Sequence, residues 1–374
     1  MDRQELESWL KNRPREDAIL IAQRAALRVF PIWASQMGQG WAREHNLTSG
    51  TLLRCYLTSG VARKYSTPEV KAAAAAAAIG AVTRAYTRVA DDPGFVARAA
   101  ASAVYAATTS APTAAATDTI IDAAYPAGYT APSATPFWAN IDRDVALLFD
   151  GNDLLSRPLW DGVVPTDILG AELEGLENLA RETGNRNSFW HRWYFAAKRG
   201  EWLDWELQRD VALIPEEVWK QGPKAVMAAI AEIEARHDLR QQVATLRQQV
   251  EALQAALVAN GHASAAHRSH NNPPELLDIP APVIVQVNAL LSPLQQAEAE
   301  LVKPAPDKSV LKRLAAALKG FLSFSAAYCG KTLDTLLQEV AKSIGQQVGP
   351  ALKWLLLANG AAPLLEALQK FLPH

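Results

Sequence analysis

The sequence predicts an all-α protein. Apolar residues recur at helical spacing through most of the chain. Alanine-rich runs, preceded by capping residues and prolines that favour helix starts, recur in its first third. No stretch shows the alternation of apolar and polar residues that is typical of a half-buried strand. We therefore expect helices joined by loops and no β-sheet.

The composition is that of a folded protein from a reducing compartment. The chain has 374 residues, of which 49% are hydrophobic, and a formal net charge of -2. This length allows two or three domains, and the charge gives no overall attraction to nucleic acid. Cys55 and Cys329 are far apart and form no CxxC motif. The charged start, MDRQELESWLKNRPRED, lacks the apolar core of a signal peptide. We expect a cytoplasmic protein with no nucleic-acid partner.

Residues 1–135 are predicted to form an Ala-rich helical domain. Its first long helix carries one apolar stripe at helical spacing, formed by Ile19, Ala22, Ala26, Val29 and Ile32. Pro31 is predicted to break or bend this helix, because proline cannot donate the helical hydrogen bond.

Two further helix starts follow in this region. Thr67 is the expected N-cap of a helix with Pro68 at its first position and seven alanines at 72–78. Asp91 or Asp92 is the expected cap of the next. With TAAATDTIIDAAY as a third instance, we expect two to four pairs of short helices that pack closely.

Three prolines in 126–137 mark a boundary, and 136–222 is predicted to be a Trp-rich helical module. Five of the eleven tryptophans lie in the stretch 188–226. They are Trp190, Trp193, Trp202, Trp205 and Trp219. Trp190 and Trp193 are three residues apart, as are Trp202 and Trp205, so the members of each pair share a helix face. Gly200 is the predicted hairpin turn between the two pairs. A core or protein-interface role is favoured over a small-molecule pocket for this cluster.

An uninterrupted helix is predicted over 223–259. In the segment LRQQVATLRQQV at 239–250 the pentad LRQQV recurs after seven positions. The apolar residues of this seam alternate at spacings of four and three. They are Leu239, Val243, Leu246, Val250, Leu253 and Leu257. Valine at a and leucine at d favour a parallel two-stranded coiled coil, so we expect this seam to join two copies of the chain. The alternative is packing against another helix of the same chain.

Familiar catalytic and cofactor motifs are missing from the sequence, so no catalytic residue, cofactor or metal is expected. His262, His267 and His270 lie close together near Glu275, in a small, polar, Pro-rich segment at 260–282. A solvated linker is favoured there over a metal site. His191 and Asp204 remain as a weak alternative active site beside the tryptophans.

Residues 283–374 are predicted to form a basic amphipathic helical domain. From residue 301 onward there are nine Lys or Arg against four Asp or Glu. Basic residues flank an apolar stripe, which is also the pattern of a helix that lies on anionic lipid. The candidates for membrane contact are Lys312, Arg313, Lys319, Phe321, Phe324 and Trp354.

Two segments resemble parts of uncharacterised bacterial and phage-associated helical proteins. The first is FWHRWYFAAKRGEWLDWELQRDVALIPEEVWKQGP, which matches their DWEL…IPEEVW…GP module, and the second is SHNNPPE. In the second, Ser269 replaces the Gly of a GHNxPPE-like motif. The likeness covers about 190–275. The group has no established activity, so the resemblance implies no site residue. It implies a bacterial origin and makes a role in phage defence a hypothesis.

The expected function is therefore that of a non-enzymatic, self-associating adaptor or assembly protein. Its partners would be a second copy of itself and another protein. The alternative is a membrane-directed effector, peripheral to the inner membrane, whose basic C-terminal helices bind or disrupt a bilayer.

Overall fold

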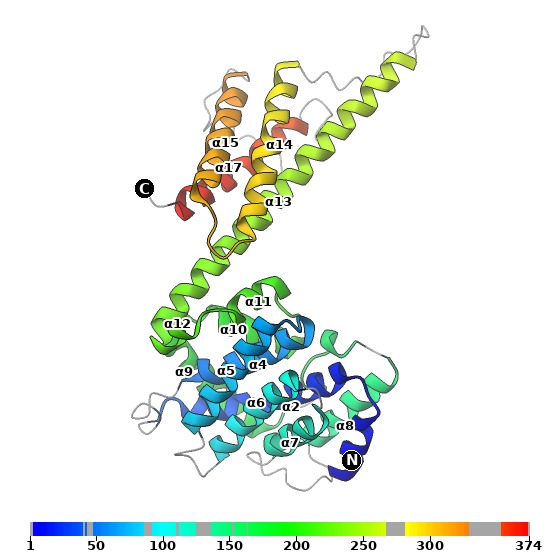
Figure 1. Cartoon of the computed structure of the whole chain (residues 1–374), viewed down its shortest axis with the longest axis vertical. Coiled ribbons are helices and arrows are strands. Elements are labelled where there is room, and N and C mark those ends of the chain that lie inside the picture. Colours follow the sequence, from blue (N-terminus) through cyan, green and yellow to red (C-terminus); the bar gives the residue numbers. More distant parts are fainter. Residues whose placement is uncertain are drawn as a thin grey trace. The chain divides into compact units, whose positions relative to one another are not determined.

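The all-α prediction is confirmed. The computed structural model describes residues 3–39, 42, 48–85, 92–109, 112–124, 136–151, 153–162, 164–266, 281–328 and 353–372. These residues form α-helices and one short 3₁₀ helix, with no strand among them (Figure 1). The elements are α1 (Arg3–Lys11), α2 (Arg15–Gln36), α4 (Ser49–Lys64), α5 (Pro68–Ala85), α6 (Asp92–Thr108), α7 (Pro112–Ala124), α8 (Pro136–Phe149), η1 (Leu154–Ser156), α9 (Thr166–Thr183), α10 (Phe189–Arg199), α11 (Trp205–Ala212), α12 (Glu216–Lys220), α13 (Pro223–Ala266), α14 (Ala281–Leu301), α15 (Lys308–Tyr328) and α17 (Lys353–Phe371).

The chain divides into two compact units, Met1–Ile233 and Glu234–His374. The division differs from the predicted domains in two respects. The Ala-rich and Trp-rich segments share one hydrophobic core, so they form one unit. The long helix α13 is not a domain of its own, because its residues up to Ile233 belong to the first unit and the rest to the second.

Helix α2 lies at the centre of the first unit, in contact with α4, α6, α7, α8 and α9. Its residues from Ala18 to Ser35 are buried on nearly every face, not along one stripe as predicted. Ile32, a member of the predicted stripe, is partly exposed. The helix also continues through Pro31 to Gln36. Because α2 is buried on nearly every face, it has no exposed polar face, and a single apolar stripe does not describe its buried surface.

The Ala-rich helices pack against α2 and against each other. Helix α5 contacts α6, and α6 contacts α7. The facing alanines, such as Ala77, Ala103 and Ala116, are almost completely buried. Small side chains let these helix backbones approach closely. The predicted cap at Thr67 is confirmed, since its hydroxyl accepts the Val70 N–H at 3.4 Å.

A buried ion network joins α2 to α8. Arg24 donates Nε to Oδ2 of Asp144 at 2.9 Å and Nη2 to Oδ1 at 3.1 Å. Arg28 donates Nη2 to the same Oδ2 at 2.6 Å. These side chains are at most 3% exposed. Other donors of the two arginines bind backbone carbonyls in the loop Leu154–Leu159, and Nη1 of Arg28 is buried without a hydrogen-bond partner.

Gly200 fixes this loop against the Trp-rich helices. It ends α10 with φ of 74°, as expected of the predicted hairpin turn. A Cβ at this position would lie 2.8 Å from backbone atoms of Arg157, so only glycine fits. The Leu159 N–H donates to the Lys198 carbonyl at 2.8 Å, and the Trp202 indole donates to the Leu155 carbonyl at 3.0 Å.

The second unit is a helical bundle made by the later part of α13 with α14, α15 and α17. Helices α13 and α14 run antiparallel. Arg247 pairs with Glu298 at 2.6 Å, whereas Gln254, further along α13, donates to Asn288, earlier on α14, at 2.7 Å. In Figure 1, α14 and α15 likewise run in opposite directions along the bundle.

The coiled-coil seam is covered by this bundle. Leu239, Val243, Leu246, Val250 and Leu253 are at most 6% exposed and belong to one core with residues of α14, α15 and α17. Leu257, whose side chain lies outside the described residues, cannot be assigned. The preferred interpretation, pairing between two copies, is therefore wrong for these five residues. Their apolar faces pack within the chain, which was the alternative.

Helix α17 packs closely on the seam at Gly360. A Cβ there would lie 3.3 Å from Cδ1 of Leu246 and 3.1 Å from Oε1 of Gln249. Helix α17 is distant from the seam in sequence, so the heptad pattern alone gives no sign of this partner.

The residues proposed for membrane contact divide into two groups. Lys312, Arg313 and Lys319 are exposed, as a charged face requires. Phe321 is 1% exposed in the core of the bundle, and Phe324 is partly buried against it. The apolar face of α15 is thus covered by the bundle, whereas membrane contact requires this face to be exposed. The side chain of Trp354 lies outside the described residues. Within the described helices, none combines the length and apolarity needed to cross a bilayer.

Both ends of the linker predicted at 260–282 are helical. Helix α13 continues through Gly261 to Ala266, and α14 starts at Ala281. His267, His270 and Glu275 lie outside the described residues, as does the side chain of His262.

We predict that replacing Asp144 will strongly destabilise the first unit. Asp144→Asn leaves two buried arginines without a carboxylate and should lower the free energy of unfolding by about 3–5 kcal/mol. Urea denaturation followed by tryptophan fluorescence measures this loss. The control Asp150→Asn changes an exposed carboxylate one turn and a half further on, and should change stability little. Equal stability of the two variants would contradict a structural role for the network.

We also predict that Leu246→Ala will destabilise the second unit and leave the molecular mass in solution unchanged. The loss should be about 2–5 kcal/mol, as for other buried leucines. Hydrogen exchange across 234–372 and light scattering measure the two effects. Gln248→Ala, at an exposed position of the same helix, is the control. A fall in mass for Leu246→Ala alone would restore the seam as an interface between copies.

Candidate functional site

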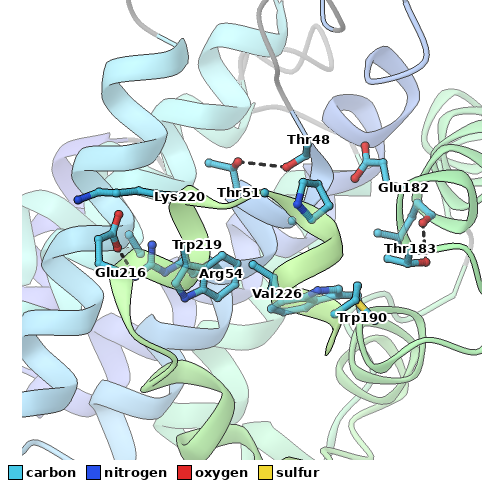
Figure 2. A pocket seen from close by; sticks show the side chains of 16 residues that line it. Thr48, Thr51, Arg54, Glu182, Thr183, Trp190, Glu216, Trp219, Lys220 and Val226 are labelled. Atoms are coloured by element: carbon cyan, nitrogen blue, oxygen red, sulfur yellow. Dashed lines mark hydrogen bonds and ion pairs between the residues drawn. The ribbon is translucent and has the colours of Figure 1, made fainter. Parts of the chain in front are cut away.

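The first unit contains a cavity of about 620 Å³. Its wall is built by the N-terminal turns of α4, the end of α9, α10, α12 and the first turns of α13, with Ala77 of α5 (Figure 2). The polar side chains in the wall are Thr48, Thr51, Arg54, Glu182, Thr183, Glu216 and Lys220. Leu179, Trp190, Trp219, Val226 and Met227 supply the apolar part. This mixture is typical of a small-molecule site.

Turn residues place α12 and α13 at the cavity. Helix α12 starts after Pro215 and is short because Gly222, with φ of 94°, reverses the chain. Pro223 then occupies the first position of α13, as its sequence context predicts. Val226 and Met227 follow one turn later and line the cavity.

Glu182 occupies the N-terminus of α4. Its two carboxylate oxygens accept the Ser49 N–H at 2.9 and 3.1 Å, and one of them accepts the Ser49 hydroxyl at 3.2 Å. These bonds stabilise a negative charge at a helix start. Burial has the opposite and larger effect, and it raises the pKa of Glu182 to about 7.

No cation of the described part of the chain pairs with Glu182. The neighbouring Arg181 donates to Asn178, and Arg54 pairs with Glu216. In Figure 2, the Lys220 side chain lies on the side of the cavity opposite Glu182 and extends away from it. The charge of Arg181 lowers the pKa of Glu182, but among the described residues no cation forms an ion pair with this carboxyl group. A perturbed group of this kind in a cleft indicates a functional site.

Arg54 forms the other charged centre of the cavity. Its guanidinium lies 4.5 Å from the centroid of the Trp219 ring, and Nη2 is 2.7 Å from Oε2 of Glu216. The Arg54 side chain is 7% exposed, and its Nε has no hydrogen-bond partner. Stacking and the ion pair together hold this cation in one orientation.

The five tryptophans form one continuous series of ring contacts. Trp219 contacts Trp190, which contacts Trp193, and the series ends with Trp202 stacked on Trp205. Trp190 and Trp193 are fully buried, whereas the other three are partly buried. Most of the cluster packs in the core, which is the role that the sequence favoured. Trp190 and Trp219 also line the cavity, as the alternative of a small-molecule pocket requires.

The residues of the weak alternative active site have structural partners. Nδ1 of His191 is 3.0 Å from the Ser188 hydroxyl and its Nε2 is 3.2 Å from the Leu176 carbonyl. Asp204 caps α11 by accepting the Glu206 and Leu207 N–H groups. Each side chain therefore supports a helix start or a helix contact, and neither lines the cavity.

Other reactive groups in the described residues are buried or dispersed. The Cys55 thiol donates to the Ala77 carbonyl, and burial raises its pKa to about 12. Such a thiol is unreactive at neutral pH. Across the described ranges, histidine, cysteine and acidic side chains do not gather into a group of three that could hold a metal ion.

Sequence reasoning missed the polar half of the cavity. Arg54 and Glu182 are far from the Trp-rich segment in sequence and belong to no motif. Only the fold brings them together with Trp190 and Trp219. The one local sign was the Thr-Ser-Gly-Thr run at 48–51, which suits a helix start.

No protein-family model, curated protein or solved structure matches this chain.

Proposed function

We propose that this protein is a non-enzymatic binding adaptor whose first unit takes a small polar organic molecule. The observation that carries the proposal is the cavity that contains Glu182, Arg54 and the tryptophans. Its volume of about 620 Å³ lies in the range of sites for small ligands. Its polar groups are few and lie on different helices, which suits recognition of one orientation.

Neighbouring residues hold the two charged side chains of the cavity in place. Ser49 fixes Glu182, while Glu216 and Trp219 fix Arg54. Side chains held in this way lose little conformational entropy when a ligand binds. A preformed site of this kind supports a binding role for the first unit.

The adaptor part of the proposal rests on the two-unit organisation. The second unit has its own hydrophobic core and could present a partner-binding surface. The seam at 239–253 is not that surface, because it is buried, so the proposal does not include pairing of copies through it. A role in a bacterial phage-defence system rests on the resemblance of 190–275 alone.

Membrane disruption is not carried forward as a second function. The apolar face of α15 is buried around Phe321, so binding through this face would require the bundle to open.

The test is to fill the cavity. Met227→Trp should occupy part of its volume, whereas Ala228→Trp places the same side chain at the adjacent, exposed position. A set of small polar metabolites is screened against the full chain by thermal denaturation. We expect a compound that raises the melting temperature of wild type and of Ala228→Trp by about 2–4 °C, corresponding to roughly 1 kcal/mol of ligand stabilisation. Met227→Trp should show no such rise. Equal stabilisation of all three proteins would contradict binding in this cavity.

A further inference from the structure

We infer that the ligand of the cavity carries a protonated amine that binds Glu182 next to the apolar wall. The inference rests on the proposed function, because it names the class of ligand for the same site.

The first argument is the geometry of the carboxyl group. Three donors, the Ser49 N–H and hydroxyl and the Gly50 N–H, bind Glu182, whereas its two oxygens provide about four lone-pair sites. Glu182 lines the cavity, where it can accept from a ligand. An ammonium group has three donors and no acceptor, which matches this arrangement.

The second argument is the charge around Glu182. Buried charges in proteins are normally paired. The other charged groups of the cavity wall are Arg54, Glu216 and Lys220. Arg54 is paired with Glu216, and Lys220 extends away from Glu182 (Figure 2). The charge of Arg181 lowers the pKa of Glu182, but no described residue forms an ion pair with it, so a ligand can supply a direct cationic partner.

The third argument is the character of the wall beside Glu182. Leu179 is one helical turn from it on α9, and Trp190, Val226 and Met227 also line the cavity. An amine attached to an apolar ring or chain would bury the apolar part there. A cation near an aromatic wall is also favourable. A compact inorganic cation would leave this surface unused.

Binding of an amine should be linked to release of a proton. Burial raises the pKa of Glu182 to about 7, so the group is partly protonated at neutral pH. An ammonium group favours the ionised carboxylate and lowers that pKa. The proton then leaves to the buffer, and the ammonium replaces it as the partner of Glu182.

Three probes of similar size and different charge test the inference. Benzylamine, benzyl alcohol and benzoate are titrated into the full chain at pH 7 and followed by ligand-observed NMR. We expect benzylamine to bind about tenfold more tightly than benzyl alcohol, because its hydrogen bond is charge-assisted, and benzoate to bind least. Glu182→Gln keeps an acceptor for Ser49 and should remove the preference for benzylamine while leaving benzyl alcohol unchanged.

Calorimetry provides a readout that needs no variant. The binding enthalpy of benzylamine should depend on the ionisation enthalpy of the buffer, with a sign that indicates proton release. Binding without proton release, or equal or tighter binding of the alcohol or benzoate, overturns the amine inference and leaves the cavity proposal standing.

The three probes can also fail to bind at about 10 mM although the metabolite screen finds another compound that binds the cavity. This result overturns the amine inference as well. Failure of the screen as well overturns the proposed function.

Discussion

The buried network of Arg24, Arg28 and Asp144 is the interaction on which the first unit depends. Two guanidinium groups and one carboxylate are taken out of water, which is tolerable only if almost every donor finds an acceptor. Burial lowers the pKa of Arg28 to about 10, which still leaves it charged at neutral pH. The carbonyls of the loop Leu154–Leu159 supply further acceptors, and these hydrogen bonds fix the position of the loop against the two arginines. This joins α2 to α8 and to the Trp-rich helices.

The position of the cavity follows from the same central helix. Asn178 of α9 donates to the carbonyls of Ala34 and Ser35 at the end of α2, at 2.8 and 2.9 Å. Gly175 lets the two helices approach closely, since a Cβ there would lie 2.7 Å from that of Ala34. Glu182 is one turn beyond Asn178 and reaches the start of α4, which also packs on α2. The carboxyl group is therefore partly buried by contacts that the fold requires.

Local features of the structure could be predicted from the sequence, and long-range features could not. The helical fold, the cap at Thr67, the turn at Gly200 and the start of α13 at Pro223 depend on neighbouring residues, and they were predicted correctly. The seam at 239–253 was recognised as an apolar surface, but its partner was not. A heptad describes one side of a contact, and α14, α15 and α17 cover it without a matching repeat. Arg54 and Glu182 belong to no sequence motif, and their role in the cavity depends on long-range packing that the local sequence does not reveal.

Recognition of an amine depends on the state of Glu182, a carboxyl group in a cavity wall that forms no ion pair with a described residue. Carbon NMR of the side-chain carboxyl groups of the full chain, with Glu182→Gln to assign the signal, measures its titration directly. We predict a midpoint near pH 7 for the free protein and a lower midpoint when the cavity holds an amine. A midpoint near 4.5, the ordinary value for glutamate, in the free protein would contradict the account, because the group would then be solvated or already paired.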